Sequence, residues 1–161
     1  MAAGDTFGVV QEVETVIVGA GPAGLSVAAC LERAGRGFEL VERAETVGSA
    51  WRSHYDRLHL HTDKGHSNLP FHPFPRDDPK YPSREQVVAY LERYATAMGL
   101  TPRLGETVTD ARRAGERWDV TTSRTVYRAA NVVIATGYAQ VPEIPVISRS
   151  IERGLLDVSP A

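Results

Sequence analysis

Apolar, β-favouring residues at 15–18 (TVIV) and 38–41 (FELV) flank a stretch, 25–34, whose leucine and alanine content favours a helix. Short apolar runs on either side of a helical segment predict a strand–helix–strand unit with two parallel strands. The helix is expected to end at Gly35 or Gly37, where glycine supplies a left-handed cap.

A second helix is predicted to begin at Ser83. Ser83 and Gln86 form the S-x-x-Q pattern of a capping box, in which each side chain satisfies a free backbone N–H. Gly99 is expected to end this helix. Apolar side chains recur at helical spacing on one face, namely Val87, Leu91, Tyr94, Ala95 and Met98.

Beyond this helix the pattern changes to strands. Residues 106–111, 118–122 and 125–127, with a turn near Gly115, predict a small antiparallel β-meander. The last strong run, 131–137 (NVVIATG), is typical of a strand buried on both faces of a parallel sheet. We therefore predict an α/β fold, with a parallel sheet into which the antiparallel meander is inserted.

Residues 44–82 lack both periodicities, yet they hold Trp51, all five histidines and five of the ten prolines. A structureless connection of this length within a compact domain is either functional or disordered. Its aromatic and apolar content argues against disorder. We expect 44–82 to form a long loop wrapped over a ligand, and residues 1–13 to form a frayed lead-in.

Candidate chemistry begins where the first strand ends, because residues 19–24 read G-A-G-P-A-G. In this pattern Gly19 makes the tight turn, Gly21 lets a pyrophosphate approach the backbone, and Gly24 lets helix and strand pack closely. The anion would bind the free N–H groups at the helix N-terminus. Glu42 ends the second strand, where an acid hydrogen-bonds a ribose hydroxyl. The sequence predicts a dinucleotide site, rather than a glycine-rich turn without a ligand.

Composition and charge narrow the function classes. The chain has 161 residues, one domain by length, and its net charge of −2 gives no electrostatic case for nucleic acid or an anionic membrane. Neither a signal-peptide pattern nor a membrane-spanning apolar stretch occurs, so we expect a soluble cytoplasmic protein.

The single cysteine, Cys30, excludes an intrachain disulfide and is expected to be an inert buried thiol. Lys64 and Lys80 are the only lysines, so almost all cationic residues are arginines, and we interpret this as a composition bias rather than a functional feature. Arg43 is either a solvated charge or a partner for anionic oxygens.

Taken together, these residues resemble the N-terminal FAD-binding part of flavin-containing monooxygenases. The most similar branch includes the YUCCA-type indole-3-pyruvate monooxygenases and their bacterial relatives. The resemblance covers residues 15–145, and the middle segment makes it specific, because a generic dinucleotide-binding fold has no need of that loop. It rests on the glycine motif at 19–25, on Glu42 and Arg43, on Trp51 and 55–61 (YDRLHLH), on the proline and aromatic residues of 69–82, and on 134–137 (IATG) with 142–145 (PEIP).

The resemblance implies a Rossmann-like FAD-binding domain whose long loop covers the cofactor. His61 falls on the isoalloxazine side, where it is expected either to order the oxygenated flavin or the substrate, as a catalytic residue, or to be satisfied by loop carbonyls. The residues that the resemblance assigns to FAD are Gly19, Ala20, Gly21, Pro22, Ala23 and Gly24 at the pyrophosphate, Glu42 at the ribose, Trp51 and Arg52 beside the flavin, Val108 at the adenine, and Ala135, Thr136 and Gly137 close to the cofactor.

The implied reaction is reduction of FAD by NADPH, capture of O₂ as a flavin C4a-(hydro)peroxide and transfer of one oxygen atom to a small organic substrate. A second G-x-G-x-x-G/A motif for NADPH and the C-terminal return of the FAD domain do not occur in the sequence. We therefore expect an incomplete FAD-binding domain at 1–145 and a tail, 146–161, without family features.

Three alternatives remain open. The chain is a truncated, non-catalytic dinucleotide-binding remnant, or it binds NAD directly at the glycine motif, for which Glu42 is suited. The third is a metal site built on His59 and His61 with His66 and His72, although no known ligand spacing matches and no metal is expected. A disulfide reductase is set aside, because it needs a redox cysteine pair.

Overall fold

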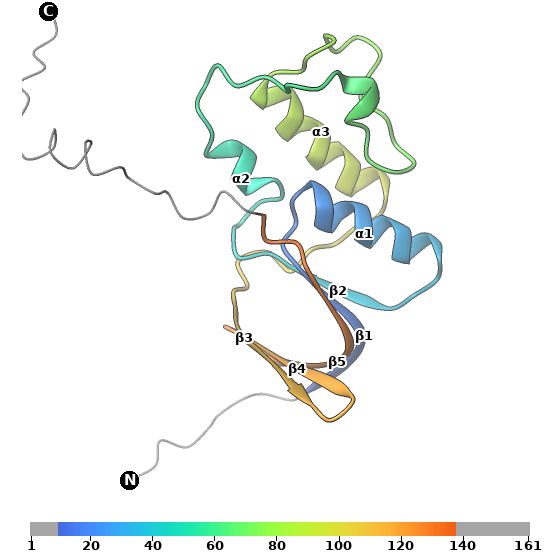
Figure 1. Ribbon diagram of the computed structural model, residues 1–161, viewed down its shortest axis with the longest axis vertical. Coiled ribbons are helices and arrows are strands. Elements are labelled where there is room, and N and C mark those ends of the chain that lie inside the picture. The colour runs from blue at the N-terminus through green and yellow to red at the C-terminus, as the bar shows by residue number, and fades with distance from the viewer. Residues whose placement is uncertain (1–9, 138–161) are drawn as a thin grey trace, which may run out of the picture.

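The computed structural model describes residues 10–137, whose five strands form one mixed sheet with the helices on one side (Figure 1). The strand order is β2-β1-β5-β4-β3, with β1 parallel to β2 and β5, and β4 antiparallel to β5 and β3. The predicted α/β class with an inserted meander is confirmed. The elements are β1 (Gln11–Val18), α1 (Pro22–Arg33), β2 (Phe38–Val41), α2 (Ser49–Arg52), the 3₁₀ helix η1 (Lys64–His66), α3 (Arg84–Ala97), β3 (Val108–Ala114), β4 (Arg117–Thr122) and β5 (Val126–Ile134).

Strand β1 begins before the apolar run that predicted it. Gln11, Glu12 and Val13 pair with 127–129 of β5, so the expectation of a frayed lead-in was wrong for residues 11–13. A parallel neighbour supplies hydrogen bonds to these residues whatever the polarity of their side chains. Residues 1–9 lie outside the described part of the chain.

Strand β5 unites two segments that the sequence pattern separates. Residues 126–127 of the return strand and 131–134 of the apolar run belong to one continuous strand, Val126–Ile134, whose first half pairs with β4 while its length follows β1. The prediction that this run is buried on both faces was wrong, since Ile134 is 67% exposed. Within the described residues, the helices cover only one face of the sheet at that end.

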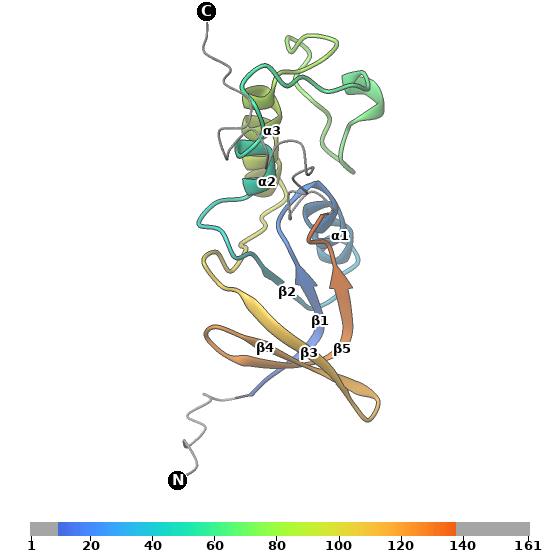
Figure 2. The same cartoon turned by 60° about the vertical axis from the view of Figure 1, so that its left-hand side comes forward.

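Each face of the sheet carries its own apolar cluster. Alternate residues of a strand point to opposite faces, so Ile17 packs toward the helices while Val16 packs toward the meander. Figure 2 shows β4 and β3 crossing β1 and β5 on the side away from α1 and α3. The cluster on that side comprises Val16, Val41, Val120, Tyr127 and Ala129.

The two long helices follow their sequence signals. Helix α1 is followed by Gly35 with φ +65°, and α3 by Gly99 with φ +66°, as predicted. The capping box at Ser83 is formed, with both reciprocal hydrogen bonds present. Cys30, however, is exposed, so the prediction of a buried thiol was wrong. Ala28 and Ala29 face the core, and Cys30 follows them around the helix to the solvent side.

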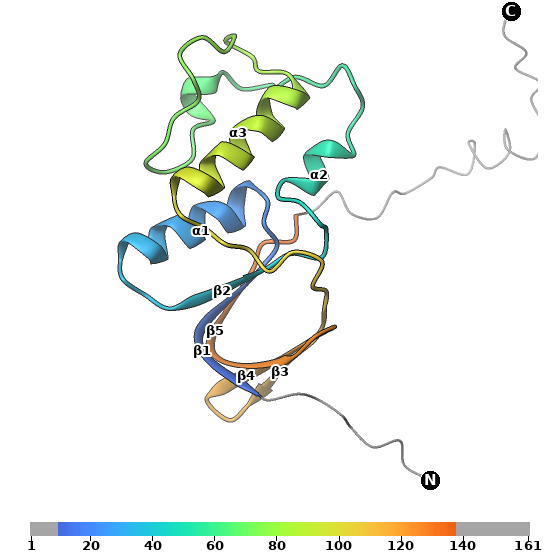
Figure 3. The same cartoon turned by 180° about the vertical axis from the view of Figure 1, so that it is seen from behind.

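The long connection at 44–82 is held against α3 rather than lacking structure (Figure 3). The Tyr90 hydroxyl accepts a hydrogen bond from Leu69 N at 2.7 Å and donates one to His72 O at 2.6 Å. The Phe74 ring stacks on Tyr90 with ring centroids 3.7 Å apart. That this loop covers a ligand stays a prediction. None of the helices between residues 10 and 137 has the length and apolar character needed to cross a membrane.

Candidate functional site

The glycine turn joins the end of β1 to the start of α1, and packing requires two of its glycines. Gly19 has φ +106°, and a Cβ there would lie 2.5 Å from Ala135 O. A Cβ on Gly24 would lie 1.8 Å from Gly19 O. Any larger residue at either position would collide with backbone. These two glycines therefore serve the fold, as the sequence predicted for the turn and for close helix–strand packing.

Gly21 is required neither by its backbone conformation nor by packing. Its φ of −83° and ψ of −172° suit any residue, and a Cβ there would meet nothing within 4 Å. The N–H groups of Gly21, Ala23 and Gly24 have no hydrogen-bond partner among the described residues. These donors point out of the first turn of α1, where the helix dipole favours an anion. The space and the donors together fit a phosphate group of a dinucleotide.

Glu42 follows β2 and is joined to the glycine turn directly. Its carboxylate is 7% exposed, and Oε2 accepts a hydrogen bond from Ala20 N at 2.8 Å. The other oxygen, Oε1, accepts one from Ala44 N at 2.9 Å and lies 3.4 Å from Ser49 Oγ. An ionised carboxylate has about four lone-pair directions, so acceptor capacity remains for ribose hydroxyls. The predicted acid therefore lies beside the turn and fits its expected role.

A third contact with the turn comes from Gly48, which sequence reasoning missed. Its N–H donates to Ala20 O at 3.0 Å, and its φ is +66°. A Cβ there would lie 2.8 Å from Leu91 Cδ1 of α3. Gly48 thus connects the start of α2 both to the glycine turn and to α3. A glycine before a short helix is the only local signal that would have indicated it.

The arginines and the tryptophan near β2 have different surroundings. Arg43 is exposed and has no hydrogen bond or ion pair within the described range. Arg52 is paired with Glu92 of α3, so its guanidinium is directed toward that helix. Trp51 is half-buried, with its ring edge against His54 at 5.8 Å between centroids. Whether Trp51, Arg52 or Arg43 contacts a cofactor stays a prediction.

The end of β5 also reaches the glycine turn. Ala135 N donates to Val18 O at 2.8 Å, and Ala135 is the residue that a Cβ on Gly19 would strike. Thr136 and Gly137 follow it and are exposed. Val108, by contrast, begins β3, the last strand in the sheet order, and packs against the cluster under the meander. Of these predicted cofactor residues, the described structure brings Ala135 and the adjoining backbone of Thr136 close to the turn, but not Val108.

His61 is exposed and makes no hydrogen bond within the described residues. The alternative that loop carbonyls satisfy His61 is therefore wrong. The histidine that does lie within hydrogen-bonding distance of a loop carbonyl is His59, whose Nδ1 is 3.0 Å from Tyr81 O. The other histidines are engaged separately, His66 with Asp63 and His72 against the Tyr90 ring. From residue 10 to residue 137, no group of three or more His, Cys, Asp or Glu side chains could hold a metal ion.

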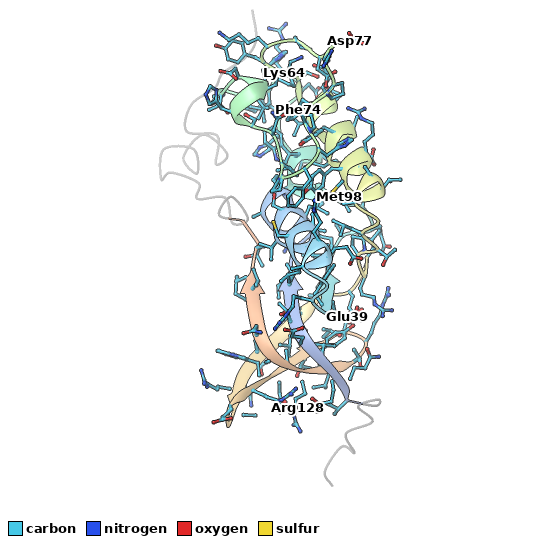
Figure 4. All side chains as sticks on the ribbon, turned by 90° about the vertical axis from the view of Figure 1, so that its right-hand side faces the viewer. Glu39, Lys64, Phe74, Asp77, Met98 and Arg128 are labelled. Atoms are coloured by element: carbon cyan, nitrogen blue, oxygen red, sulfur yellow. The ribbon has the colours of Figure 1, made fainter. Side chains whose placement is uncertain are left out.

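A cavity of about 580 Å³, which sequence reasoning missed, lies at the opposite end of β2. It is lined by the C-terminal end of α1, the start of β2 and residues 99–103. Arg103 and Glu39 form a two-pronged ion pair in its wall, with N–O distances of 2.9 and 3.3 Å, and this hydrogen bonding raises the pKa of the Arg103 guanidinium. In Figure 4, Glu39 lies between Met98, which follows α3, and the far end of the sheet. Ligands of open parallel sheets bind at the carboxyl ends of the strands, so this cavity is at the wrong end for the dinucleotide.

Comparisons with known proteins show which family the chain is similar to. A family model described as pyridine nucleotide-disulphide oxidoreductase matches residues 16–152. The indole-3-pyruvate monooxygenase YUCCA1 of Oryza sativa subsp. japonica is 46% identical over 134 residues, covering 81% of this chain and 33% of that protein. The solved flavin-containing monooxygenase from Stenotrophomonas maltophilia aligns with a TM-score of 0.76 and 30% identity, over 86% of this chain and 43% of that one. A steroid monooxygenase solved with NADP aligns with a TM-score of 0.77 and 27% identity, over 84% of this chain and 28% of that one.

The chain spans about a third of the length of the curated relatives that it matches. The matched region includes the glycine turn, Glu42 and the long loop. The family model covers most of the chain, and the relatives that share its sequence are flavin monooxygenases. The chain therefore belongs to the pyridine nucleotide-disulphide oxidoreductase family, and within it to the flavin-containing monooxygenases.

Proposed function

We propose that this chain is the FAD-binding segment of an FAD-dependent, NADPH-using monooxygenase that transfers one atom of O₂ to a small organic substrate. One observation carries the proposal. Within residues 10–137, open space lies beside Gly21 next to three N–H groups without a partner, and the buried Glu42 side chain is hydrogen-bonded to the same turn. Donors for a phosphate thus lie next to an acceptor for a ribose hydroxyl, as an FAD pyrophosphate and adenosine ribose require.

The roles of the individual residues follow from this arrangement. The N–H groups of Gly21, Ala23 and Gly24 would hold the pyrophosphate, and Glu42 would accept from the ribose. The unpaired guanidinium of Arg43 is placed to neutralise anionic oxygens nearby. The backbone that precedes Val108 runs beside Glu42, since Glu106 N donates to Glu42 O at 2.9 Å, which supports an adenine contact there.

The flavin side of the site is proposed from Trp51, Arg52 and His61. Trp51 supplies an apolar wall, and its backbone N–H donates to Gly48 O at 2.9 Å, which ties it to the turn contact described above. His61 is exposed and unpartnered within the described residues, so its ring is free to donate to a ligand. Residues 135–137 would approach the cofactor from β5.

When bound, FAD supplies the redox and oxygen chemistry, and the protein supplies binding, orientation and exclusion of water. The curated relative's name assigns it indole-3-pyruvate, and we propose a small organic substrate for this protein as well. We place the FAD-binding domain at 1–145 and the protein in the cytoplasm, without nucleic-acid or membrane partners. Residues 138–145 and the predicted tail, 146–161, lie outside the described residues.

Purification of the chain with added FAD, followed by removal of free cofactor, tests the proposal. We expect a visible flavin band that remains with the protein and a raised melting temperature, because a ligand that binds only the folded state stabilises it. NAD serves as the matched control and is expected to give a smaller shift. The absence of a flavin band, or an equal shift with NAD, would contradict an FAD site. Lack of NADPH oxidation by this chain is expected both from the proposal and from the non-catalytic remnant, because a glycine motif for NADPH does not occur in its sequence.

A further inference from the structure

A second buried acid, Glu106, lies between α3 and β3, and its carboxylate has no part in the site described so far. It is 3% exposed, and its Oε1 lies 2.6 Å from Thr122 Oγ1 and 3.3 Å from the Tyr127 hydroxyl, both of which donate to it. Burial, with a smaller contribution from the nearby charge of Glu106, raises the pKa of the Tyr127 phenol to about 12, so this donor stays protonated. The carboxylate is therefore anchored to β4 and β5 in the middle of the sheet.

The backbone next to Glu106 holds Glu42 from both sides. Glu42 N donates to Arg103 O at 3.0 Å, and Glu106 N donates to Glu42 O at 2.9 Å. Arg103 also forms a parallel bridge with Val41, so residues 103–106 act as a further strand along β2. The position of Glu42 is thus fixed by a segment whose own anchor is the Glu106 side chain.

A continuous chain of hydrogen bonds results. It runs from Thr122 and Tyr127 to the Glu106 carboxylate, through the Glu106 backbone to Glu42, and from the Glu42 carboxylate to Ala20 N at 2.8 Å. Burying an acid costs free energy that an apolar side chain of similar volume would not cost. The Thr122 and Tyr127 hydroxyl donors offset that cost. The Glu106 carboxylate in turn gives residues 103–106 a defined position.

We propose that Glu106 is a positioning residue that holds Glu42 against the glycine turn, in the orientation that binds a ribose hydroxyl. The ribose part of this inference rests on the proposed FAD site. Loss of the Glu106 anchor lets residues 103–106 shift, and Glu42 then loses both its fixed backbone and its contact with Ala20. The effect on the cofactor is indirect, because the Glu106 carboxylate is bonded to Thr122 and Tyr127 and acts through the backbone of Glu42.

Amide hydrogen exchange of the FAD-free chain tests the positioning without any cofactor. In Glu106→Ala we expect the Ala20 amide to exchange at least about tenfold faster than in the wild type. The matched control is Val120→Ala, which removes a fully buried apolar side chain from β4 but no donor or acceptor of the hydrogen-bond chain. It should lower global stability but leave the Ala20 amide within about twofold of the wild type. Equal acceleration of Ala20 in both variants would overturn the proposal.

Two further variants keep the test decisive if Glu106→Ala does not fold. Glu106→Gln retains an acceptor for Thr122 and Tyr127 and should restore most of the Ala20 protection. Thr122→Val removes the donor at 2.6 Å and should accelerate Ala20 exchange in the direction of Glu106→Ala. A Gln variant as fast as Ala, or no response to Thr122→Val, would contradict positioning through these hydrogen bonds.

FAD titration of the same proteins, followed by flavin fluorescence, tests the ribose part. We expect the dissociation constant to rise about tenfold in Glu106→Ala and to stay within about twofold in Val120→Ala. Unchanged affinity in Glu106→Ala would overturn the link to the ribose. Absence of binding in the wild type would instead reject the proposed FAD site, while the Ala20 exchange rates would still decide whether Glu106 positions Glu42.

Discussion

At the scale of single residues, the three glycines of the turn differ in what they do for the free protein. Gly19 and Gly24 are needed because a Cβ would strike backbone atoms of the turn or of Ala135. Gly21 has an ordinary extended conformation and open space where a side chain would be. A site for a bound group explains Gly21, whereas the fold alone explains the other two.

Alanine substitutions at Gly21 and Gly24 should separate these roles in the cofactor-free chain. Gly24→Ala forces a Cβ to 1.8 Å from Gly19 O and should lower the free energy of unfolding by more than about 2 kcal/mol. Gly21→Ala should change it by less than about 1 kcal/mol, because the weaker helix cap is offset by a less flexible unfolded chain. Urea denaturation measures both values. Equal destabilisation would mean that Gly21 is also a packing residue.

At the scale of elements, the long loop is fixed by a few long side chains rather than by regular structure. Lys64 begins η1, and its ammonium donates to Pro75 O at 2.9 Å, to Arg76 O at 2.7 Å and to Asp78 O. All three donors of the lysine are therefore used. Lys64 lies at the end of the molecule remote from Arg128 of the sheet (Figure 4). The lysine content, interpreted from sequence as composition bias, conceals a structural role for this residue.

Lys64→Met should loosen the loop around residues 75–80. Each hydrogen bond to a charged group contributes about 1.5–3 kcal/mol, so local opening should become at least about tenfold more frequent. Limited trypsin digestion, with the rate of cleavage after Arg76 as readout, measures this opening. Lys80→Met is the control, because Lys80 is the only other lysine in the sequence and its ammonium, among the described residues, lies over the exposed Tyr81 ring without donating to the loop backbone. If both variants are cleaved at the wild-type rate, Lys64 does not hold the loop.

What the sequence could predict depends on how local each signal is. The capping box at Ser83, the glycine stop at Gly99 and the glycine turn with Glu42 are short patterns, and the structure has each where expected. The start of β1 at Gln11 depends on pairing with residues more than a hundred positions away, which no local pattern encodes. The roles of Gly48 and Glu106 were missed for the same reason, since their partners lie on distant elements.

At the scale of the whole molecule, the glycine turn lies between two differently built halves. One half packs α1, α3 and the long loop on one face of the sheet, and the other folds the meander over the opposite face. Both halves bury tyrosines, among them Tyr94 in the first and Tyr127 in the second. Burial raises the pKa of both phenols to about 12, with smaller contributions from neighbouring charges.

These two tyrosines predict how the molecule responds to alkali. A pKa of about 12 in the folded state, against 10.0 as the ordinary value, means that the folded chain binds protons more tightly. The resulting stabilisation is complete below about pH 10 and is lost as the pH rises through about 12. Urea denaturation at a series of pH values should therefore show stability falling across this window.

Tyr94→Phe and Tyr127→Phe are the matched variants for the alkaline effect. Each should reduce the slope of stability against pH between about 10 and 12, whatever it does to stability at neutral pH. An unchanged slope in both variants would show that other groups govern alkaline unfolding.

The central claim, a dinucleotide site at the glycine turn, is tested most directly by the dissociation constant of FAD in the wild type and in Gly21→Ala. The wild type should bind FAD, and Gly21→Ala should bind it at least about tenfold more weakly, a difference of about 1.4 kcal/mol, because its methyl group fills the space meant for the pyrophosphate. The variant should melt within a few degrees of the wild type when both are free of cofactor, since that methyl group meets no atom of residues 10–137 within 4 Å. Equal FAD affinity in the two proteins, or no binding by the wild type, would contradict this account.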